Sequence, residues 1–278
     1  MFLEEFTLDA SEIFHHPALQ VQDTPVLPAP GSLLGAGASL FLASDLFPAS
    51  AVRRRKRLER ATLQVLSPSQ AATYSGECLD QFDLDVFLGC LLRDLRRQKP
   101  VRRSMRDFLR LLGRRPTPSY MVRLEASLLR LANGRIALAD RRFGCCVQLV
   151  ESVLVDRDQG VCRAQASPEA IAAFREIEGL ETMARLRFSL GQRPLTKWLA
   201  GLISVVGGEA CLLDLNRLRV LCGRGSTDSA VFAGQALPAL ATLVDLGYIQ
   251  SMRQCQNGRV MVVRHGGRNR AAECQLVW

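Results

Sequence analysis

Residues 104–134 read SMRDFLRLLGRRPTPSYMVRLEASLLRLANG, and this stretch predicts two helices separated by a proline-containing turn. The first helix, residues 104–112, places Phe108 among spaced leucines and ends at Gly113, since glycine readily adopts the left-handed conformation that closes a helix. The second helix, residues 119–132, repeats leucine at helical spacing and ends at an Asn-Gly pair. Two helices joined by a short turn are typical of a helix-turn-helix.

The elements around this pair extend the pattern. A helix begins upstream at Asp80 or Asp83, either of which can cap it, and carries Leu84 and Phe87 at helical spacing. Downstream, alternating or β-branched residues predict strands at residues 135–139, 145–155 and 161–166, with a hairpin turn at 156–160. Three helices followed by a β-hairpin are the order of elements in a winged helix.

The same order returns in the C-terminal half. Apolar spacing predicts helices at residues 193–206, 212–222 and 228–246, and a hairpin formed by residues 248–253 and 259–264. The turn of this hairpin contains Asn257 and Gly258, a strong hairpin signal. Residues 108–114 (FLRLLGR) resemble residues 218–224 (LRVLCGR), with one leucine, the glycine and the last arginine identical at an offset of 110, which predicts two copies of one domain.

Residues 1–50 differ from the rest of the chain. They contain five prolines, a glycine-rich stretch and six acidic residues but no lysine or arginine, which predicts a flexible acidic arm. We therefore expect an α+β protein with two tandem winged-helix domains and a flexible N-terminal arm. The expected boundaries are residues 1–50 for the arm, 51–175 for the first winged-helix domain, and 176–278 for the second domain with its basic tail.

Charge separates this arm from the body of the protein. The whole chain carries a formal net charge of +9, and residues 51–278 hold all 36 basic residues with 21 of the 27 acidic ones, a balance of +15. Within residues 93–115, ten basic residues accompany two acidic ones. A basic body of this kind favours a polyanionic partner, and for winged helices that partner is double-stranded DNA.

Several classes of protein are disfavoured. No apolar run reaches the roughly 18 residues of a membrane span, and the acidic N-terminus lacks the positive region of a signal peptide. The nine cysteines are scattered without C-x-x-C spacing, which favours reduced thiols in a cytoplasmic protein. No phosphate-binding loop of the G-x-x-x-x-G-K-[ST] type is present. We therefore expect no membrane contact, no metal and no cofactor.

Catalytic residue sets are also missing from the sequence. A metal-dependent nicking enzyme needs two histidines separated by one residue and a nucleophilic tyrosine, whereas His15 and His16 are adjacent and lie far from every tyrosine. Asp83 and Asp85 diverge on one helix, so a capping role suits them better than acid–base catalysis. The sequence therefore predicts a binding protein and not an enzyme.

Arginines and polar residues on the helices and hairpins are the expected DNA contacts. Arginines around the second helix bind phosphates, while Arg123 and Arg130 on the third helix can pair with guanine. A solvated helix face is the alternative interpretation. The counterpart helix, residues 228–246, has no lysine or arginine, so the second domain is expected to act through its hairpin and tail. The predicted DNA-binding residues are Arg102, Arg103, Arg106, Arg114, Arg115, Ser119, Tyr120, Arg123, Ser127, Arg130, Arg141, Arg142, Arg259, Arg264 and Arg268.

Two motifs carry a family resemblance. Residues 73–87 (TYSGECLDQFDLDVF) resemble the Y-[ST]-G-x-x-L-D-Q-x-D-L-D-V signature of TrfA-type plasmid replication initiators. Residues 193–199 (RPLTKWL) are similar to the K-P-L-x-x-W-L helix of that family, and shorter blocks between residues 218 and 240 follow in family order. The resemblance spans residues 45–264.

The resemblance implies two winged-helix domains that bind direct repeats (iterons) at a plasmid origin as a monomer, while dimers restrain replication. It also implies melting of adjacent AT-rich DNA, with single-stranded origin DNA as a further partner, and recruitment of the host initiator, replicative helicase and sliding clamp. The clamp-binding peptide of the family, Q-L-S-L-F, has its nearest counterpart at residues 38–41 (ASLF). A winged-helix transcriptional repressor is the alternative function, and a footprint over several direct repeats separates the two.

Overall fold

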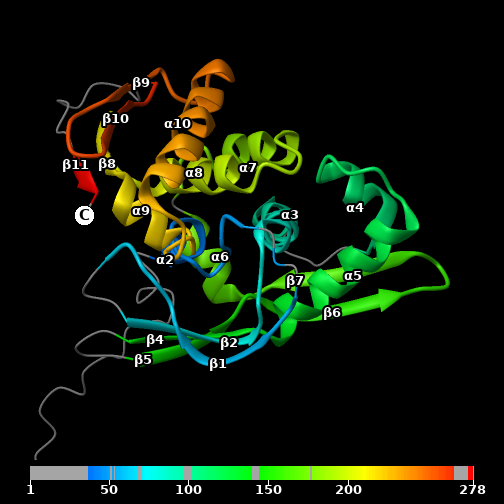
Figure 1. Cartoon of the computed structure of the whole chain (residues 1–278). Coiled ribbons are helices and arrows are strands. Elements are labelled where there is room, and N and C mark those ends of the chain that lie inside the picture. Colours follow the sequence, from blue (N-terminus) through cyan, green and yellow to red (C-terminus); the bar gives the residue numbers. More distant parts are fainter. Residues whose placement is uncertain are drawn as a thin grey trace, which may run out of the picture.

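The computed structural model describes residues 37–50, 52, 54–67, 71–96, 102–139, 144–175, 177–265 and 275–277. In this part of the chain, helices combine with three sheets whose neighbouring strands are antiparallel except for one parallel pair. Figure 1 shows a long hairpin on one side and the C-terminal sheet on the other, with helices between them. This mixture agrees with the expected α+β class. None of the described helices is both long and apolar enough to span a membrane.

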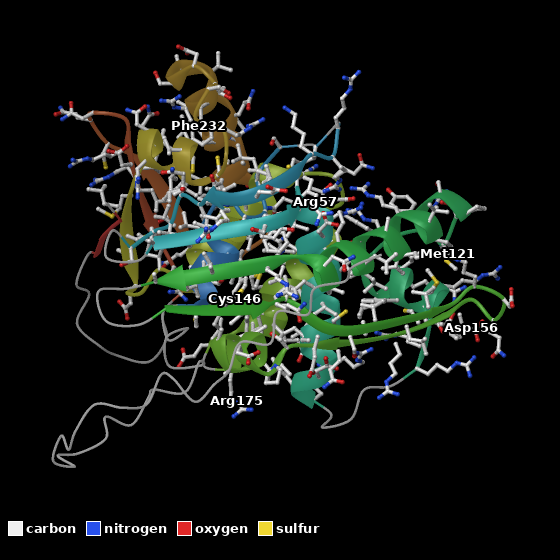
Figure 2. The ribbon with its side chains drawn as sticks, turned by 90° about the horizontal axis from the view of Figure 1, so that it is seen from below. Arg57, Met121, Cys146, Asp156, Arg175 and Phe232 are labelled. Carbon is white, nitrogen blue, oxygen red and sulfur yellow. The ribbon has the colours of Figure 1, made fainter. Side chains whose placement is uncertain are left out.

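The first half contains a series of a helix, a strand, two helices and a hairpin. The elements are α3 (Gln81–Arg96), β3 (Arg103–Ser104), α4 (Met105–Leu111), α5 (Pro118–Asn133), β6 (Val150–Asp156) and β7 (Val161–Ala166). The hairpin turns at residues 157–160, as expected, and β3 pairs with β7 to give the order β3-β7-β6. The hairpin extends beyond the body of the protein, with Asp156 near its far end (Figure 2).

The second half repeats this series. Its elements are α8 (Pro194–Val205), β8 (Ala210–Asp214), α9 (Leu215–Leu221), α10 (Ser229–Asp245), β9 (Ser251–Gln254) and β10 (Arg259–Val263). β8 pairs with β10 as β3 pairs with β7, and β11 (Gln275–Val277) adds a parallel strand beside β8. The helix expected from residue 212 begins later, because Asp214 ends β8 and its side chain caps α9. Asn257 and Gly258 form the hairpin turn with positive φ angles.

The two series end their second helix in the same way. After α4, Gly113 takes φ +67° and its N–H donates a 3.0 Å hydrogen bond to the Arg110 carbonyl. After α9, Gly223 takes φ +72° and its N–H donates a 3.0 Å hydrogen bond to the Val220 carbonyl. The sequence that matches at an offset of 110 residues therefore occupies equivalent places in the two halves.

A separate sheet accompanies the first series. It consists of β1 (Arg57–Thr62), β2 (Ala71–Glu77), β4 (Arg135–Ala139) and β5 (Gly144–Gln148), in the order β1-β2-β4-β5. The single strand expected at residues 145–155 is wrong: it divides at Leu149, which is fully buried, so that β5 pairs with β4 and β6 pairs with β7. The hairpin of the first series therefore begins at β6, and Arg135 lies in the other sheet.

Residues 37–50 belong to the packed body, which corrects the expected extent of the flexible arm. They include the short helix α2 (Gly37–Leu42), where Phe41 is only 1% exposed. The Phe41 ring centroid lies 5.8 Å from that of Phe87 on α3. Burial of such apolar side chains stabilises the fold, so this segment packs although it follows a proline-rich stretch. Residues 1–36 lie outside the described part of the chain.

The same packing bears on the segment that most resembles a clamp-binding peptide, residues 38–41. Leu40 is 3% exposed and contributes with Phe41 to the core around α3. A partner protein cannot reach either side chain in this fold. The expectation that residues 38–41 act as a clamp-binding peptide is therefore corrected, because these residues are part of the core.

Two helices that the sequence pattern does not predict connect the two series: α6 (Pro168–Arg175) and α7 (Leu180–Ser189). α6 begins after Ser167, whose hydroxyl accepts a hydrogen bond from the Ala170 N–H (3.1 Å). A serine cap followed by proline is a helix-start signal. α7 packs against both α3 and α8, and so joins the two halves of the protein.

Candidate nucleic-acid interface

Two carboxylates at the start of α3 form a reciprocal cap. Asp80 Oδ1 accepts hydrogen bonds from the backbone N–H groups of Phe82 (2.8 Å) and Asp83 (3.0 Å). Asp83 Oδ2 in turn accepts from the backbone N–H of Asp80 (2.9 Å) and from the Arg55 guanidinium (2.8 Å). The predicted capping role is confirmed for Asp80 and Asp83 but is wrong for Asp85, which pairs with Arg187 and Lys197. Asp83 is also a fully buried ion-pair partner.

Two predicted DNA contacts on α5 face these carboxylates and not solvent. Asp83 Oδ1 accepts hydrogen bonds from Ser127 Oγ (2.6 Å) and from Arg130 Nη2 (2.7 Å). Ser127 is fully buried, and the side chain of Arg130 is 9% exposed. The prediction that Ser127 and Arg130 contact DNA is therefore wrong. Both lie on the side of α5 that packs against α3, because a buried carboxylate there needs donors.

Arg123 lies at the edge of the exposed face of α5. Its guanidinium carbon is 4.3 Å from the centroid of the Phe82 ring, and its Nη2 is 3.4 Å from Asp80 Oδ2. The side chain is 41% exposed. The cation–π contact and the ion pair hold the guanidinium beside α3 while leaving part of it accessible to solvent.

The exposed face of α5 is uncharged. It includes Ser119, Val122, which is 68% exposed, and Leu129, which is 43% exposed. The equivalent face of α10 includes Val231, which is 53% exposed, and Gln235. The third helices of both series therefore present apolar and small polar groups to solvent.

Arginines border the face of α5 on two sides. Arg106 and Arg110 on α4, and Arg115 in the following loop, are exposed. Arg157 in the β6–β7 turn is 78% exposed and pairs with Glu125 on α5 (2.5 Å). This pair holds the hairpin beside the helix, so positive charge flanks the uncharged face from the second helix and from the hairpin.

Arg102 and Arg103 lie at β3, where both line a cavity between α3, α4 and α7. Arg102 pairs with Asp156 (3.3 Å) and donates to Gln159 in the hairpin turn. Arg103 is half-buried, with its guanidinium carbon 5.7 Å from the centroid of the Phe108 ring. Both arginines therefore also contribute to local packing.

Arg114 and Tyr120 belong to the contact between the two series. Arg114 Nη2 donates to the Gly191 carbonyl (2.6 Å), and its guanidinium carbon lies 6.0 Å from the centroid of the Tyr120 ring. The Tyr120 hydroxyl accepts a hydrogen bond from Gln192 Nε2 (3.2 Å). These contacts fix the start of α5 relative to the loop before α8.

The predicted contacts of the second series lie at its hairpin. Arg259 and Arg264, at the start of β10 and just after it, are both half-buried. Arg264 Nη1 donates to the Val206 carbonyl (2.8 Å), which ties the end of the hairpin to α8. The other predicted contacts, Arg141, Arg142 and Arg268, lie outside the described residues.

A buried ion cluster that the sequence analysis missed joins α3, α7 and α8. Asp85 on α3 accepts hydrogen bonds from Arg187 on α7 (3.0 Å) and from Lys197 on α8. Arg187 also donates to the Lys197 carbonyl (2.6 Å) and to Gln81 Oε1 (2.9 Å). All these side chains are buried, and burial lowers the pKa of Lys197 to about 8.

The two family-like motifs supply Asp85 and Lys197 of this cluster, whereas Arg187 lies on α7 outside both motifs. Asp83 and Asp85 are two positions apart on one helix, so they point to different neighbours. Asp83 meets α5, whereas Asp85 meets α7 and α8. The partner of Asp85 on α8 is Lys197, which lies within the second motif.

A groove of about 350 Å³ opens between the two series beside this cluster. Five basic side chains and one carboxylate, Asp80, line it. Arg55 and Arg123 border it from the first half of the protein, and Arg193 and Lys197 border it from the second half. The groove therefore continues the positive charge from the start of α5 across the junction.

Comparison with known proteins identifies the fold. No family model matches the chain, and no curated protein matches its sequence. The structure is similar to the crystal structure of the RctB domains 2-3, with a TM-score of 0.57 and 11% sequence identity over 82% of this chain and 97% of that chain. A structure of SeMet derivatives of domain 2 and domain 3 of RctB matches with a TM-score of 0.55 and 12% identity, covering 84% and 97%. The chain therefore shares the fold of these two RctB domains.

Proposed function

We propose that this chain is a TrfA-type replication initiator, a binding protein without catalytic activity that recognises direct repeats at a plasmid origin. The observation that carries the proposal is the repeated series of a helix, a strand, two helices and a hairpin, which is the order of a winged helix. The fold shared with RctB domains 2-3 and the initiator-like motifs at residues 73–87 and 193–199 support it.

Base recognition is assigned to the third helix of each winged-helix unit, which enters the major groove in this class of protein. α5 offers Ser119, Val122 and Leu129, while α10 offers Val231 and Gln235. Apolar side chains contact the thymine methyl group, and glutamine pairs with adenine. The two helix faces therefore favour repeats that contain A·T pairs.

Phosphate binding is assigned to the arginines that flank these helices. Arg106, Arg115 and Arg157 surround the face of α5, and Arg253 and Arg259 lie on the hairpin of the second unit. Contacts to phosphate release counterions and so make affinity depend on salt. Two units on successive helical turns cover about 20 base pairs.

The proposal includes the further steps that the family resemblance implies. They are melting of adjacent AT-rich DNA, binding of the separated strand, contact with the host initiator, helicase and sliding clamp, and dimerisation as a restraint. Because Leu40 and Phe41 are buried, contact with the clamp is assigned to another part of the chain.

Footprinting on the DNA that flanks the reading frame of this protein tests the proposal. An initiator protects several direct repeats beside an AT-rich stretch, in steps of about two helical turns. A single protected operator at the promoter, without flanking repeats, would identify a repressor instead. Absence of any protected site within that DNA would contradict the proposal.

A further inference from the structure

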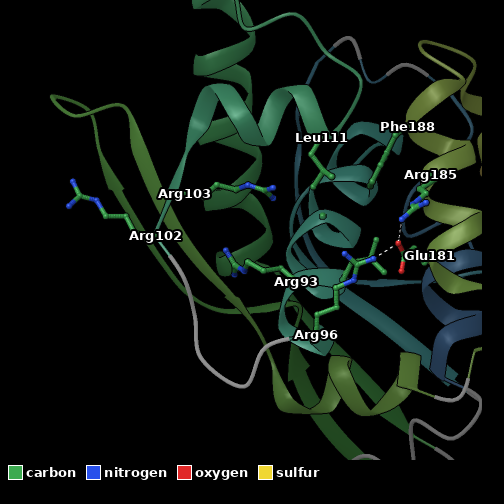
Figure 3. Close-up of a pocket in the computed structure, with 10 residues that line it drawn as sticks. Arg93, Arg96, Arg102, Arg103, Leu111, Glu181, Arg185 and Phe188 are labelled. Atoms are coloured by element: carbon green, nitrogen blue, oxygen red, sulfur yellow. Dashed lines mark hydrogen bonds and ion pairs between the residues drawn. The ribbon is translucent and has the colours of Figure 1, made fainter.

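A cavity separate from the exposed faces of α5 and α10 lies between α3, β3, α4 and α7 (Figure 3). Its volume is about 400 Å³, which falls within the range of small-molecule sites. Apolar side chains, five arginines and one carboxylate line it. Among the charged lining residues, only Arg102 and Arg103 are also predicted contacts with duplex DNA.

The floor of the cavity is apolar. Leu92, Leu111 and Phe188 line it, and Leu111 is 39% exposed. Gly89 on α3 allows α4 to pack closely, because a Cβ at this position would lie 2.5 Å from the Phe108 ring. A concave apolar floor with convergent polar groups favours a ligand with an apolar body.

One side of the rim is a carboxylate held by two arginines. Arg96 on α3 and Arg185 on α7 both pair with Glu181. The hydrogen bond from Arg96 is the main cause that lowers the pKa of Glu181, so the carboxylate is ionised at neutral pH. Guanidinium groups present forked donors that suit phosphate as well as carboxylate, and Glu181 occupies donors that a phosphate could use.

Further positive charge comes from the first series. Arg93 pairs with Asp94 (2.9 Å), whereas Arg103 forms no ion pair with a carboxylate in the part of the chain that the structure describes. In Figure 3, Arg102 extends away from the other labelled side chains. The other four arginines and the two carboxylates, Asp94 and Glu181, together carry a net charge of two positive units. A bound anion would stabilise positive charges that are held around a small cavity.

We propose that this cavity binds a nucleoside phosphate, with phosphate oxygens on Arg96, Arg103 and Arg185 and the base over the apolar floor. Two sources have this chemistry: a free nucleotide and one nucleotide of single-stranded DNA. None of the lining residues belongs to α5 or α10, so the proposal stands apart from the binding of duplex repeats.

Titration calorimetry of the full chain with ATP, inorganic triphosphate and a thymidine hexanucleotide tests this proposal. Loss of one charge-assisted contact in Arg96→Gln or Arg185→Gln is expected to weaken ATP binding about tenfold or more. The matched control is Arg175→Gln on α6, an exposed arginine outside the cavity lining, which is expected to change affinity less than about twofold. Leu111→Glu places a negative charge on the partly exposed floor and is expected to abolish binding.

Two further measurements sharpen the assignment. Glu181→Gln removes the competing carboxylate and is expected to tighten ATP binding about threefold or more. ATP is expected to bind more tightly than inorganic triphosphate, and equal affinities would overturn the role of the floor. Binding of the hexanucleotide but not ATP, with the same sensitivity to Arg185→Gln, would identify single-stranded DNA as the source.

The proposal is overturned if none of the three probes binds at about 1 mM, where even a weak site is occupied. It is also overturned if Arg175→Gln weakens binding as much as Arg185→Gln does. Duplex binding measured on the same variants is expected to be unchanged, so failure here is distinguishable from failure of the proposed function.

Discussion

The helix pair α4–α5 and the helix pair α9–α10 have the same backbone design but different charges. Both second helices end at a left-handed glycine, Gly113 or Gly223, and both third helices expose an uncharged face. α5 nevertheless contains Arg123 and Arg130, whereas α10 contains no basic residue. Charge on a third helix therefore does not by itself identify a DNA-binding surface.

The difference arises from the helix against which each pair packs. α3 carries Asp83 toward α5, and a fully buried carboxylate requires donors such as Arg130 and Ser127. In the second half, the buried residues of α10 are all apolar, among them Phe232 and Leu240. Arg123 and Arg130 of α5 therefore pair with the carboxylates at the start of α3, and the exposed faces of α5 and α10 are both uncharged.

The largest effect is expected where the two halves meet. Asp85→Ala leaves Arg187 and Lys197 buried without their carboxylate and should lower the free energy of unfolding by about 4 kcal/mol. Urea denaturation followed by circular dichroism measures this loss. The control is Asp107→Ala, which breaks an exposed pair on α4 and should cost less than about 1 kcal/mol. Equal losses in the two variants would show that the cluster does not hold the halves together.

The second prediction separates the buried arginine of α5 from the partly exposed one. Arg130→Met should lower the free energy of unfolding by about 3 kcal/mol, because Asp83 loses a buried partner. Arg123→Met should cost less than about 1 kcal/mol, since that side chain is 41% exposed. Denaturant titrations of both variants provide the measurement. A stable Arg130→Met variant with selectively reduced DNA affinity would restore Arg130 as a base contact.

Helical periodicity predicted α3, α4, α5 and the helices of the second half because each has one apolar side. Periodicity does not show which other segment packs against a helix. The sequence therefore predicts that Ser127 and Arg130 face solvent, whereas both donate hydrogen bonds to Asp83, more than 40 residues away. The division of one predicted strand at Leu149 was missed for the same reason: pairing with β4 and β7 is decided by distant segments. The apolar pattern did not predict α6 or α7. A local signal for α6 is present, because Ser167 and the proline after it form a helix start.

A smaller change in stability is expected from the effect of pH on Lys197 at the junction. Burial lowers the pKa of Lys197 from 10.5 to about 8, so between these values the unfolded chain binds more protons than the folded chain. The free energy of unfolding attributable to Lys197 should therefore rise by about 1 kcal/mol or more as pH increases from 8 to 10. Asp85 and Arg187 face this amine within the buried cluster. Stability curves for the wild type and Lys197→Met should diverge above pH 8, and parallel curves would contradict the shift.

The smallest effect on folding is expected at the exposed arginines beside α5. Arg106→Gln and Arg115→Gln should leave the free energy of unfolding unchanged within about 0.5 kcal/mol. Each should reduce the slope of log affinity against log salt by about one unit, on repeat-containing and random duplexes alike. Fluorescence anisotropy at several salt concentrations measures the slope. An unchanged slope in both variants would place these arginines away from the phosphates.

If α5 and α10 present equivalent, uncharged faces to duplex DNA, a carboxylate placed on either face should weaken binding. Val122→Glu and Val231→Glu introduce a carboxylate at positions that are 68% and 53% exposed, so folding should be unaffected. Each should weaken binding to the protected repeat about tenfold or more by repelling the DNA backbone, whereas Leu246→Glu beyond the end of α10 should not. Unchanged affinity for the repeat in both Val122→Glu and Val231→Glu would show that neither helix face contacts the DNA.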